Sequence, residues 1–243
     1  MKTSSLLTLP ALALLLFVLV ASSPGDAQAE SSWVTDFSQF NADDYYEGGN
    51  AYWEDNDQYY VLTDAQGGQA GRIFTRTSFN MGIFTADFDI FIGDGDQNGS
   101  DGMTFAWVRA YDYEGGGGGY LDFYGADGFA VEFDTYPNGE YNDPNEEHIG
   151  LLQDGVDNHL ATWQTNVNEL QCSEWRHVTV TNNLGHIEVT WEDNVVINYD
   201  IEDYEAFDGY FGFTAGTGGG VDRHLVDNVQ IVVGGPKMEL SPQ

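Results

Sequence analysis

The sequence predicts an all-β protein, a sandwich or barrel of short antiparallel strands. Short apolar or alternating runs dominate the chain, and no long stretch shows the 3.6-residue apolar periodicity of an amphipathic helix. Turn signals such as Gly67-Gly68 and Asn138-Gly139 separate the runs, and 30 glycines are spread over 243 residues. Many short strands at this spacing are typical of β-sandwiches and β-barrels.

The predicted strands are of two kinds, those in which apolar and polar residues alternate and those that are apolar almost throughout. The run 84–92 has an apolar residue at nearly every second position, which indicates a half-buried strand, and 186–191 repeats this pattern. The run 103–108 is almost continuously apolar. In chain order, the predicted strands are 58–62, 71–77, 84–92, 103–108, 129–136, 176–181, 186–191, 195–199, 209–215 and 226–233.

The first 29 residues have the pattern of a secretory signal peptide. Lys2 precedes an apolar run from Leu6 to Val20, and Ala27-Gln28-Ala29 resembles a signal-peptidase cleavage site. We therefore expect cleavage after Ala29, a secreted extracellular protein, and no membrane insertion of the mature chain. Residues 30–236 are enough for one β-sandwich domain, and residues 237–243 form a short C-terminal tail.

The formal charge of the chain is -33, with seven basic residues against 40 acidic ones. Such a surface repels nucleic acid and anionic membranes, so we expect neither as a partner. Disorder is not expected, because aromatic residues make up 14% and apolar residues 42% of the chain. A folded polyanion poor in lysine predicts a halophilic source, where salt screens repulsion. Cys172 has no partner for an internal disulfide, and we expect it to be buried.

The segment 131–150 concentrates the chemistry of the chain. If it begins as a β-strand, Glu132, Asp134 and Tyr136 line one face, and the two carboxylates stand roughly 6.5–7 Å apart. Like charges beside an apolar layer are costly unless they are protonated or neutralised by a cation.

The residue types in this segment suggest two kinds of cation. An all-oxygen set, which Ca²⁺ prefers, comprises Asp134, the carbonyl of Tyr136, the side chain of Asn138, and Asp143. A mixed nitrogen and oxygen set, suited to Mn²⁺ or another first-row transition ion, comprises Glu132, Asp134, Asp143 and His148. We expect His159, His177 and His186 to be ordinary sandwich residues, because none has a partner at metal-ligand spacing.

The run VEFDTYPN, followed by Asp143-Pro144 and His148-Ile149-Gly150, resembles the metal-binding signature of the legume-type (L-type) lectins with concanavalin spacing. The resemblance implies a concanavalin-like jelly-roll β-sandwich and a bacterial or archaeal secreted member of the family. It also implies one Ca²⁺ and one transition ion. The implied roles place Glu132 and His148 on the transition ion, Asp134 and Asp143 between the two ions, and Tyr136 and Asn138 on Ca²⁺.

The same resemblance implies a carbohydrate site. Ser100-Asp101-Gly102 resembles the loop whose Asp follows a cis peptide and accepts hydrogen bonds from sugar hydroxyls, and Gly119 ends a matching glycine loop. The sugar-binding residues implied in this way are Asp101, Gly119, Tyr136, Asn138, Gly219 and Gly220. We expect glycans of the mannose/glucose or galactose type as ligands, and a homo-oligomer, because one shallow site binds weakly and avidity strengthens it.

Two alternatives remain open at this point. A jelly-roll glycoside hydrolase would use Glu132 and Asp134 as a catalytic pair. However, the glucanase-type motif needs a third acid where this chain has Pro137. The other alternative is a structural or adhesive surface protein that its metal ions merely stiffen. We expect a binding protein rather than an enzyme.

Overall fold

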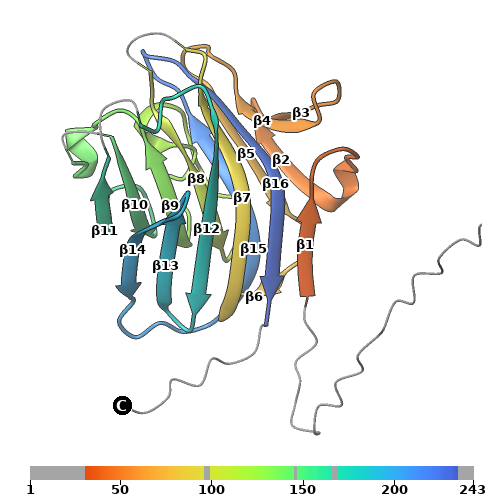
Figure 1. The fold of residues 1–243 in the computed structure, drawn as a ribbon, viewed down its shortest axis with the longest axis vertical. Helices are drawn as coiled ribbons and strands as arrows, with labels where there is room; N and C mark the ends of the chain where they lie inside the picture. Colours follow the sequence, from red (N-terminus) through yellow and green to blue (C-terminus); the bar gives the residue numbers. More distant parts are fainter. Residues whose placement is uncertain (1–30, 96–98, 145–146, 166–168, 235–243) are drawn as a thin grey trace, which may run out of the picture.

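The computed structural model describes residues 31–95, 99–144, 147–165 and 169–234. Two antiparallel sheets stack face to face (Figure 1). The first sheet has the order β14 (Asn194–Asp200), β13 (His186–Trp191), β12 (Trp175–Asn183), β7 (Ile83–Gly93), β16 (Arg223–Val233), β4 (Tyr59–Thr63) and β3 (Tyr52–Glu54), with β1 (Ser31–Thr35) also paired to β16.

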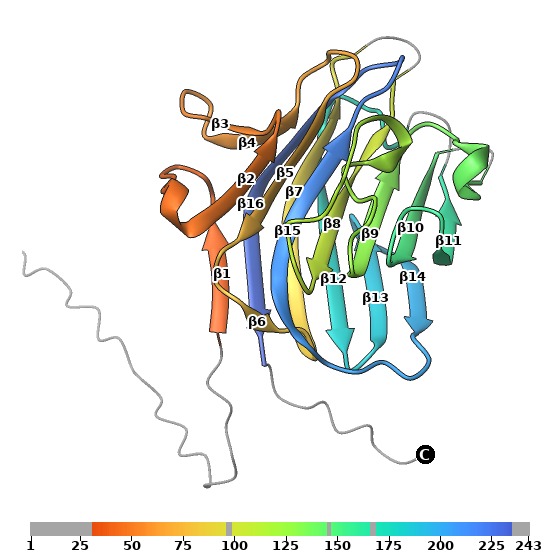
Figure 2. The ribbon, with the colours of Figure 1, turned by 180° about the vertical axis from the view of Figure 1, so that it is seen from behind.

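The second sheet lies in front when the molecule is seen from behind (Figure 2). Its order is β11 (His159–Gln164), β10 (His148–Gln153), β9 (Gly128–Asp134), β8 (Gly102–Val108), β15 (Asp208–Gly216), β5 (Ala70–Thr75) and β2 (Tyr45–Gly49), with β6 (Phe79–Asn80) also paired to β15. Three short 3₁₀ helices complete the described part: η1 (Ala42–Asp44), η2 (Gly118–Tyr120) and η3 (Gly139–Tyr141).

The prediction of an all-β sandwich of antiparallel sheets is confirmed, and each of the ten predicted runs corresponds to an observed strand. Six observed strands were not predicted from the sequence: the four short strands β1, β2, β3 and β6, and the longer strands β10 and β11. β10 is buried on both faces over most of its length and β11 is half-exposed, so neither shows clean alternation. The predicted signal peptide, residues 1–29, and the tail, residues 237–243, lie outside the described residues. No helix in the described residues is long and apolar enough to cross a membrane.

The space between the sheets is filled mainly by aromatic side chains. Phe88 on β7 lies 4.9 Å from Phe105 on β8 and 5.0 Å from Phe213 on β15, measured between ring centroids. Large rings bury much apolar area and lock neighbouring strands together. The expectation that Cys172 is buried is wrong: it lies half-buried in the loop before β12.

A second apolar cluster covers the outer face of the second sheet. Phe123, from the loop between β8 and β9, packs there with Ala106, Ala130 and Leu152. β8 and β9 are consequently buried on both faces. The same loop carries the glycines 115–119, and the N–H of Gly118 donates to the carbonyl of Thr217 at 2.9 Å, so the glycine run lies near the start of β8 and the end of β15.

The pairing register between β8, β9 and β10 brings Asp101, Asp134 and His148 to the same end of the second sheet. Gly102 on β8 is opposite Asp134 on β9, and Asp134 is opposite His148 on β10. The residue before β8, Asp101, is therefore at the same end of the sheet as the acidic end of β9.

Candidate functional site

The two carboxylate side chains of β9 lie on the outer face of the second sheet, away from the core between the sheets. Val131 and Phe133 enter the core between the sheets, whereas Glu132 and Asp134 point the opposite way. β9 ends at Asp134, so Tyr136 lies in the bend beyond the strand rather than on its face. The Tyr136 backbone N–H donates to Oδ1 of Asp134 at 2.8 Å, and the Tyr136 side chain is 45% exposed.

The bend after β9 returns a third carboxylate to the site. The backbone N–H of Asn138 donates to Oδ2 of Asp143 at 2.6 Å, and η3 closes when the Tyr141 N–H donates to the carbonyl of Asn138 at 2.8 Å. The donor atoms of Asp134, Asp143 and His148 then lie within 4.8 Å of one another.

This carboxylate cluster suits a cation. Burial, together with the charges of Glu132 and Asp143, raises the pKa of Asp134 well above its usual value, and burial likewise raises the pKa of Asp143. Oδ1 of Asn138 is buried beside them without a hydrogen-bond partner among the described residues. Buried oxygen atoms whose negative charge is uncompensated are the donor set that a cation stabilises, so the residues fit the two ions that the sequence predicts.

His159 is where the structure departs from the sequence reasoning. Its Nε2 lies 2.6 Å from Oε1 of Glu132 and 3.4 Å from Nε2 of His148. The expectation that His159 has no partner at metal-ligand spacing is therefore wrong. Its partner is distant in the chain, and sequence spacing alone does not show a contact made across strands. Burial acts to raise the pKa of Glu132, but hydrogen bonds from the two histidines hold it below its usual value.

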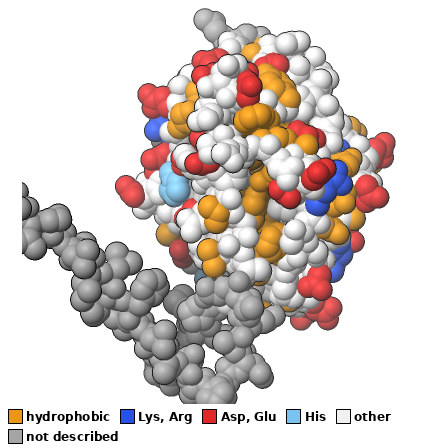
Figure 3. Space-filling model, turned by 90° about the vertical axis from the view of Figure 1, so that its right-hand side faces the viewer, with side chains coloured by type: hydrophobic (Ala, Val, Ile, Leu, Met, Phe, Trp, Pro, Cys, Tyr) orange, Lys and Arg blue, Asp and Glu red, His pale blue; other side chains and the backbone are white. Residues whose placement is uncertain are grey.

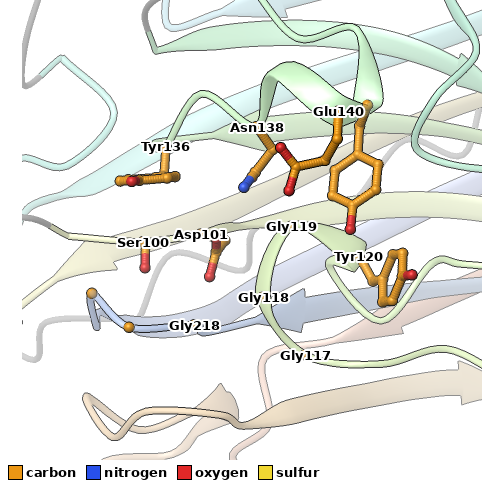
Figure 4. A pocket seen from close by; sticks show the side chains of 13 residues that line it. Ser100, Asp101, Gly117, Gly118, Gly119, Tyr120, Tyr136, Asn138, Glu140 and Gly218 are labelled. Carbon is orange, nitrogen blue, oxygen red and sulfur yellow. The ribbon is translucent and has the colours of Figure 1, made fainter.

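A pocket of about 660 Å³ opens beside the acidic cluster (Figure 4). Asp101 precedes β8, whereas Tyr136 and Asn138 come from the bend after β9, and all three face the same space in Figure 4. All six predicted sugar-binding residues lie in its lining: Asp101, Gly119, Tyr136, Asn138, Gly219 and Gly220. Four further lining residues were not predicted to bind sugar: Ser100, Tyr120, Glu140 and Tyr141.

Asp101 sits at the base of this pocket and is only 4% exposed. The Ser100-Asp101 peptide bond is cis, as the resemblance implies. The backbone of Asp101 is held at both ends, since its N–H donates to Gly216 at 3.0 Å and its carbonyl accepts from the Thr135 N–H at 2.9 Å. Oδ2 of Asp101 is buried without a hydrogen-bond partner among the described residues, and burial raises the pKa of this carboxyl to about 6.

The glycines of the pocket allow close approach. A Cβ atom at Gly218 would lie 2.8 Å from Oδ2 of Asp101, and one at Gly119 would overlap with Oδ1 of Asn138. A larger residue at either position would displace a polar atom that faces the pocket.

A buried ion pair supports the glycine loop from behind. Nε and Nη2 of Arg72 donate to the two carboxylate oxygens of Asp122, each at 2.6 Å. Oδ1 of Asp122 also accepts from the backbone N–H of Gly116 at 2.8 Å. This bidentate pair positions the loop without facing the pocket, and nothing in the local sequence pairs two residues 50 positions apart.

Comparison with known proteins places the chain in a family. The legume lectin domain model matches residues 35–241. The galactose-binding lectin of Arachis hypogaea is 36% identical over 94 residues, a stretch that covers 35% of this chain and 34% of that protein. The chain thus matches only about a third of the length of this curated relative.

Solved structures show the same fold over a longer stretch. The basic winged bean lectin with Tn-antigen has a TM-score of 0.72 at 18% identity, covering 84% of this chain and 98% of that chain. The Bauhinia forficata lectin in complex with GalNAc has a TM-score of 0.68 at 19% identity, with the same coverage.

The domain match covers most of the chain, and the two-sheet fold agrees with it. Lectins of this kind bind carbohydrate and are not enzymes, which confirms the expectation of a binding protein over a glycoside hydrolase. The chain belongs to the legume lectin family of carbohydrate-binding proteins.

Proposed function

We propose that the protein binds carbohydrate reversibly in the pocket around Asp101, and that Ca²⁺ and one transition ion are needed to shape this pocket. The proposal rests mainly on one observation. Two buried oxygen atoms, Oδ2 of Asp101 and Oδ1 of Asn138, have no hydrogen-bond partner among the described residues, and both residues line the pocket beside the carboxylate cluster. Unpartnered buried polar atoms are costly, so they imply a ligand.

Each pocket residue has a distinct role in this proposal. Asp101 accepts hydrogen bonds from two adjacent sugar hydroxyls, and the side-chain amide of Asn138 donates one. Backbone N–H groups near Gly119, Gly219 and Gly220 complete the polar ring. The exposed ring of Tyr136 offers an apolar surface for the C–H face of the sugar.

The cations act indirectly. Ca²⁺ would be held by Asp134, the Tyr136 carbonyl, Asn138 and Asp143, and the transition ion, Mn²⁺ or another first-row ion, by Glu132, Asp134, Asp143 and His148. Bound ions supply positive charge that neutralises the carboxylates. The chain's own bend then holds Asn138 in place before the sugar arrives, which lowers the cost of binding.

Galactose-type sugars are the first ligands to test. The relative from Arachis hypogaea is named a galactose-binding lectin, and the two related structures contain Tn-antigen and GalNAc. Mannose and glucose remain the alternative class. The side chains of Glu140 and Tyr141 at the rim are available to discriminate between them.

We further propose that the protein acts outside the cell as a homo-oligomer. Export is supported by the signal-like segment 1–29. Oligomerisation is supported by the weak sugar binding expected of a single shallow site, about 4–5 kcal/mol or a Kd near millimolar, because several linked sites bind a glycan surface more tightly. Light scattering in molar salt should show an oligomer, and a monomer would contradict this part of the proposal.

A glycan array probed in molar salt tests the central proposal. With Ca²⁺ and Mn²⁺ present, the protein should bind one class of sugar, and EDTA should abolish that binding. No glycan signal in the metal-loaded protein, combined with a lower melting temperature in EDTA, would instead support the structural or adhesive alternative.

A further inference from the structure

We propose that His159 is a direct ligand of the transition ion, a fifth protein side chain beside Glu132, Asp134, Asp143 and His148. We also propose that this second imidazole shifts the preference of the site from Mn²⁺ toward Zn²⁺, Co²⁺ or Ni²⁺. This inference rests on the proposed function, because it concerns the same metal-shaped pocket.

The donor atoms converge as ligands of one ion do. Oε1 of Glu132 lies 2.6 Å from Nε2 of His159 and 3.0 Å from Nε2 of His148, and the two Nε2 atoms are 3.4 Å apart. Neighbouring ligands of a six-coordinate ion with bonds of about 2.1 Å lie about 3.0 Å apart, and those of a tetrahedral ion about 3.4 Å apart. Oδ1 of Asp143 is 3.8 Å from Nε2 of His159, and the donor atoms of Asp143, Asp134 and His148 form an adjoining group that shares His148 with the first.

The three closest groups are almost sealed from solvent. The side chains of His159, Glu132 and His148 are 9%, 1% and 0% exposed. Two imidazoles whose Nε2 atoms both point at one carboxylate oxygen form an inward-facing N, N, O set, which an ion satisfies better than a proton does.

An irregularity in β11 turns His159 toward this set. Leu151 on β10 pairs with Ala161, but the next residue, Leu152, pairs with His159, so Leu160 is an extra residue in the strand. Such a bulge changes which face the residues beyond it occupy. Without it, His159 would point toward the core, where Leu160 and Ala161 pack instead.

Gly150 on β10, the strand between β9 and β11, leaves room for the contact between Glu132 and His159. It is opposite Glu132 on β9 and opposite Thr162 on β11. A Cβ atom at Gly150 would overlap with Oε1 of Glu132. The absence of a side chain lets Glu132 reach across β10 to His159.

The donor set predicts the change in metal preference. Oxygen ligands and water suit Mn²⁺, whereas each added imidazole favours Zn²⁺, Co²⁺, Ni²⁺ or Cu²⁺. With two imidazoles and three carboxylates, the site should therefore bind Zn²⁺ much more tightly than Mn²⁺, while the all-oxygen Ca²⁺ set is unaffected by His159.

His159→Gln is the informative variant, because the Gln side-chain amide is still able to donate a hydrogen bond to Glu132. His186→Gln is the matched control: His186 lies on β13 of the other sheet, 41% exposed and paired with Asp200. Calorimetric titration of the metal-free proteins should show that His159→Gln weakens Zn²⁺ binding by more than about tenfold. Mn²⁺ binding should weaken much less than Zn²⁺ binding, Ca²⁺ binding should change little, and the control should match the unaltered protein.

Pulsed EPR of the protein with one equivalent of Cu²⁺ counts coordinated imidazole rings directly. Two rings in the unaltered protein and one in His159→Gln would support the proposal. One ring in the unaltered protein, or an unchanged ratio of Zn²⁺ to Mn²⁺ affinity in His159→Gln, would overturn it and leave His159 as a hydrogen-bond partner of Glu132. Glycan binding by the unaltered protein with Ca²⁺ and Mn²⁺ is measured separately, so a failure of the proposed function is distinguishable from a failure of the ligand assignment.

Discussion

At the scale of single residues, the site separates sugar contact from metal binding. Asp101 faces the pocket with an unpartnered oxygen, whereas Asp134 is buried among the other carboxylates, only 2% exposed. The two acids have the same charge but different neighbours, so their removal should have different consequences.

Replacing each acid by alanine tests this division. Asp101→Ala should abolish glycan binding and leave metal content and melting largely unchanged, because it removes only the acceptor of sugar hydroxyls. Asp134→Ala should lose both cations and lower stability in their presence, since an ion at about 100 times its Kd contributes about 2.7 kcal/mol. Metal analysis, thermal melts and glycan binding measure the three effects, and identical behaviour of the two variants would contradict the division.

The pKa of Asp101 predicts a pH dependence. Burial raises this pKa from 3.8 to about 6, so the carboxyl gains a proton as the pH is lowered through about 6. The protonated form is a poorer acceptor, and affinity should fall by up to about tenfold for each further pH unit. Glycan titrations at saturating cations, with cation occupancy followed in parallel, measure the profile. Full affinity at about pH 4 with the ions still bound would count against Asp101 as the acceptor.

At the scale of elements, the glycine loop depends on a contact behind the pocket. Arg72 on β5 and Asp122 in the loop are 8% and 4% exposed and bind each other through two hydrogen bonds. Removing one partner of a buried pair leaves a charge uncompensated, which costs far more than the pair contributes.

Arg72→Met should therefore lower the free energy of unfolding by about 3–5 kcal/mol and weaken glycan binding by releasing the glycine loop. Denaturant unfolding and glycan titration measure the two effects. Arg176→Met is the control, because Arg176 pairs with the exposed Glu174 at 3.1 Å and should change neither property appreciably. Equal losses in both variants would show that the loop does not depend on the buried pair.

At the scale of the whole molecule, the unusual property is the large excess of acidic over basic residues. Acidic side chains are spread over the face seen in Figure 3, with few basic groups among them. Most carboxylates therefore repel one another across the surface of a compact sandwich with a formal charge of -33.

Salt should stabilise the protein because it screens this repulsion. The melting temperature should rise between about 0.1 M and about 3 M NaCl, as the Debye length falls from about 10 Å to below about 3 Å. Thermal melts at a series of NaCl concentrations, with cations held at saturation, measure the effect. A melting temperature that does not change would contradict the predicted halophilic source.

How much of this was readable from the sequence differs between the fold and the site. Period-two runs such as 84–92 predict strands locally, and the segment 131–150 contains most of the donor atoms in one stretch. β10 was missed because its sequence, HIGLLQ, shows no alternation and its apolar residues are interrupted by Gly150, unlike the longer apolar runs of β8 and β9. His159, Arg72 and Asp122 were missed because their partners are far away in the chain.

The sequence by itself determined the strand pattern, the charge, and the acidic donor set with its neighbouring bend, because each depends on residue types at short spacing. Only the tertiary structure decided which histidine joins Glu132, which ion pair supports the glycine loop, and which glycines admit polar atoms. Those contacts depend on cross-strand register and on one bulge in β11, and register is set by pairing between distant segments.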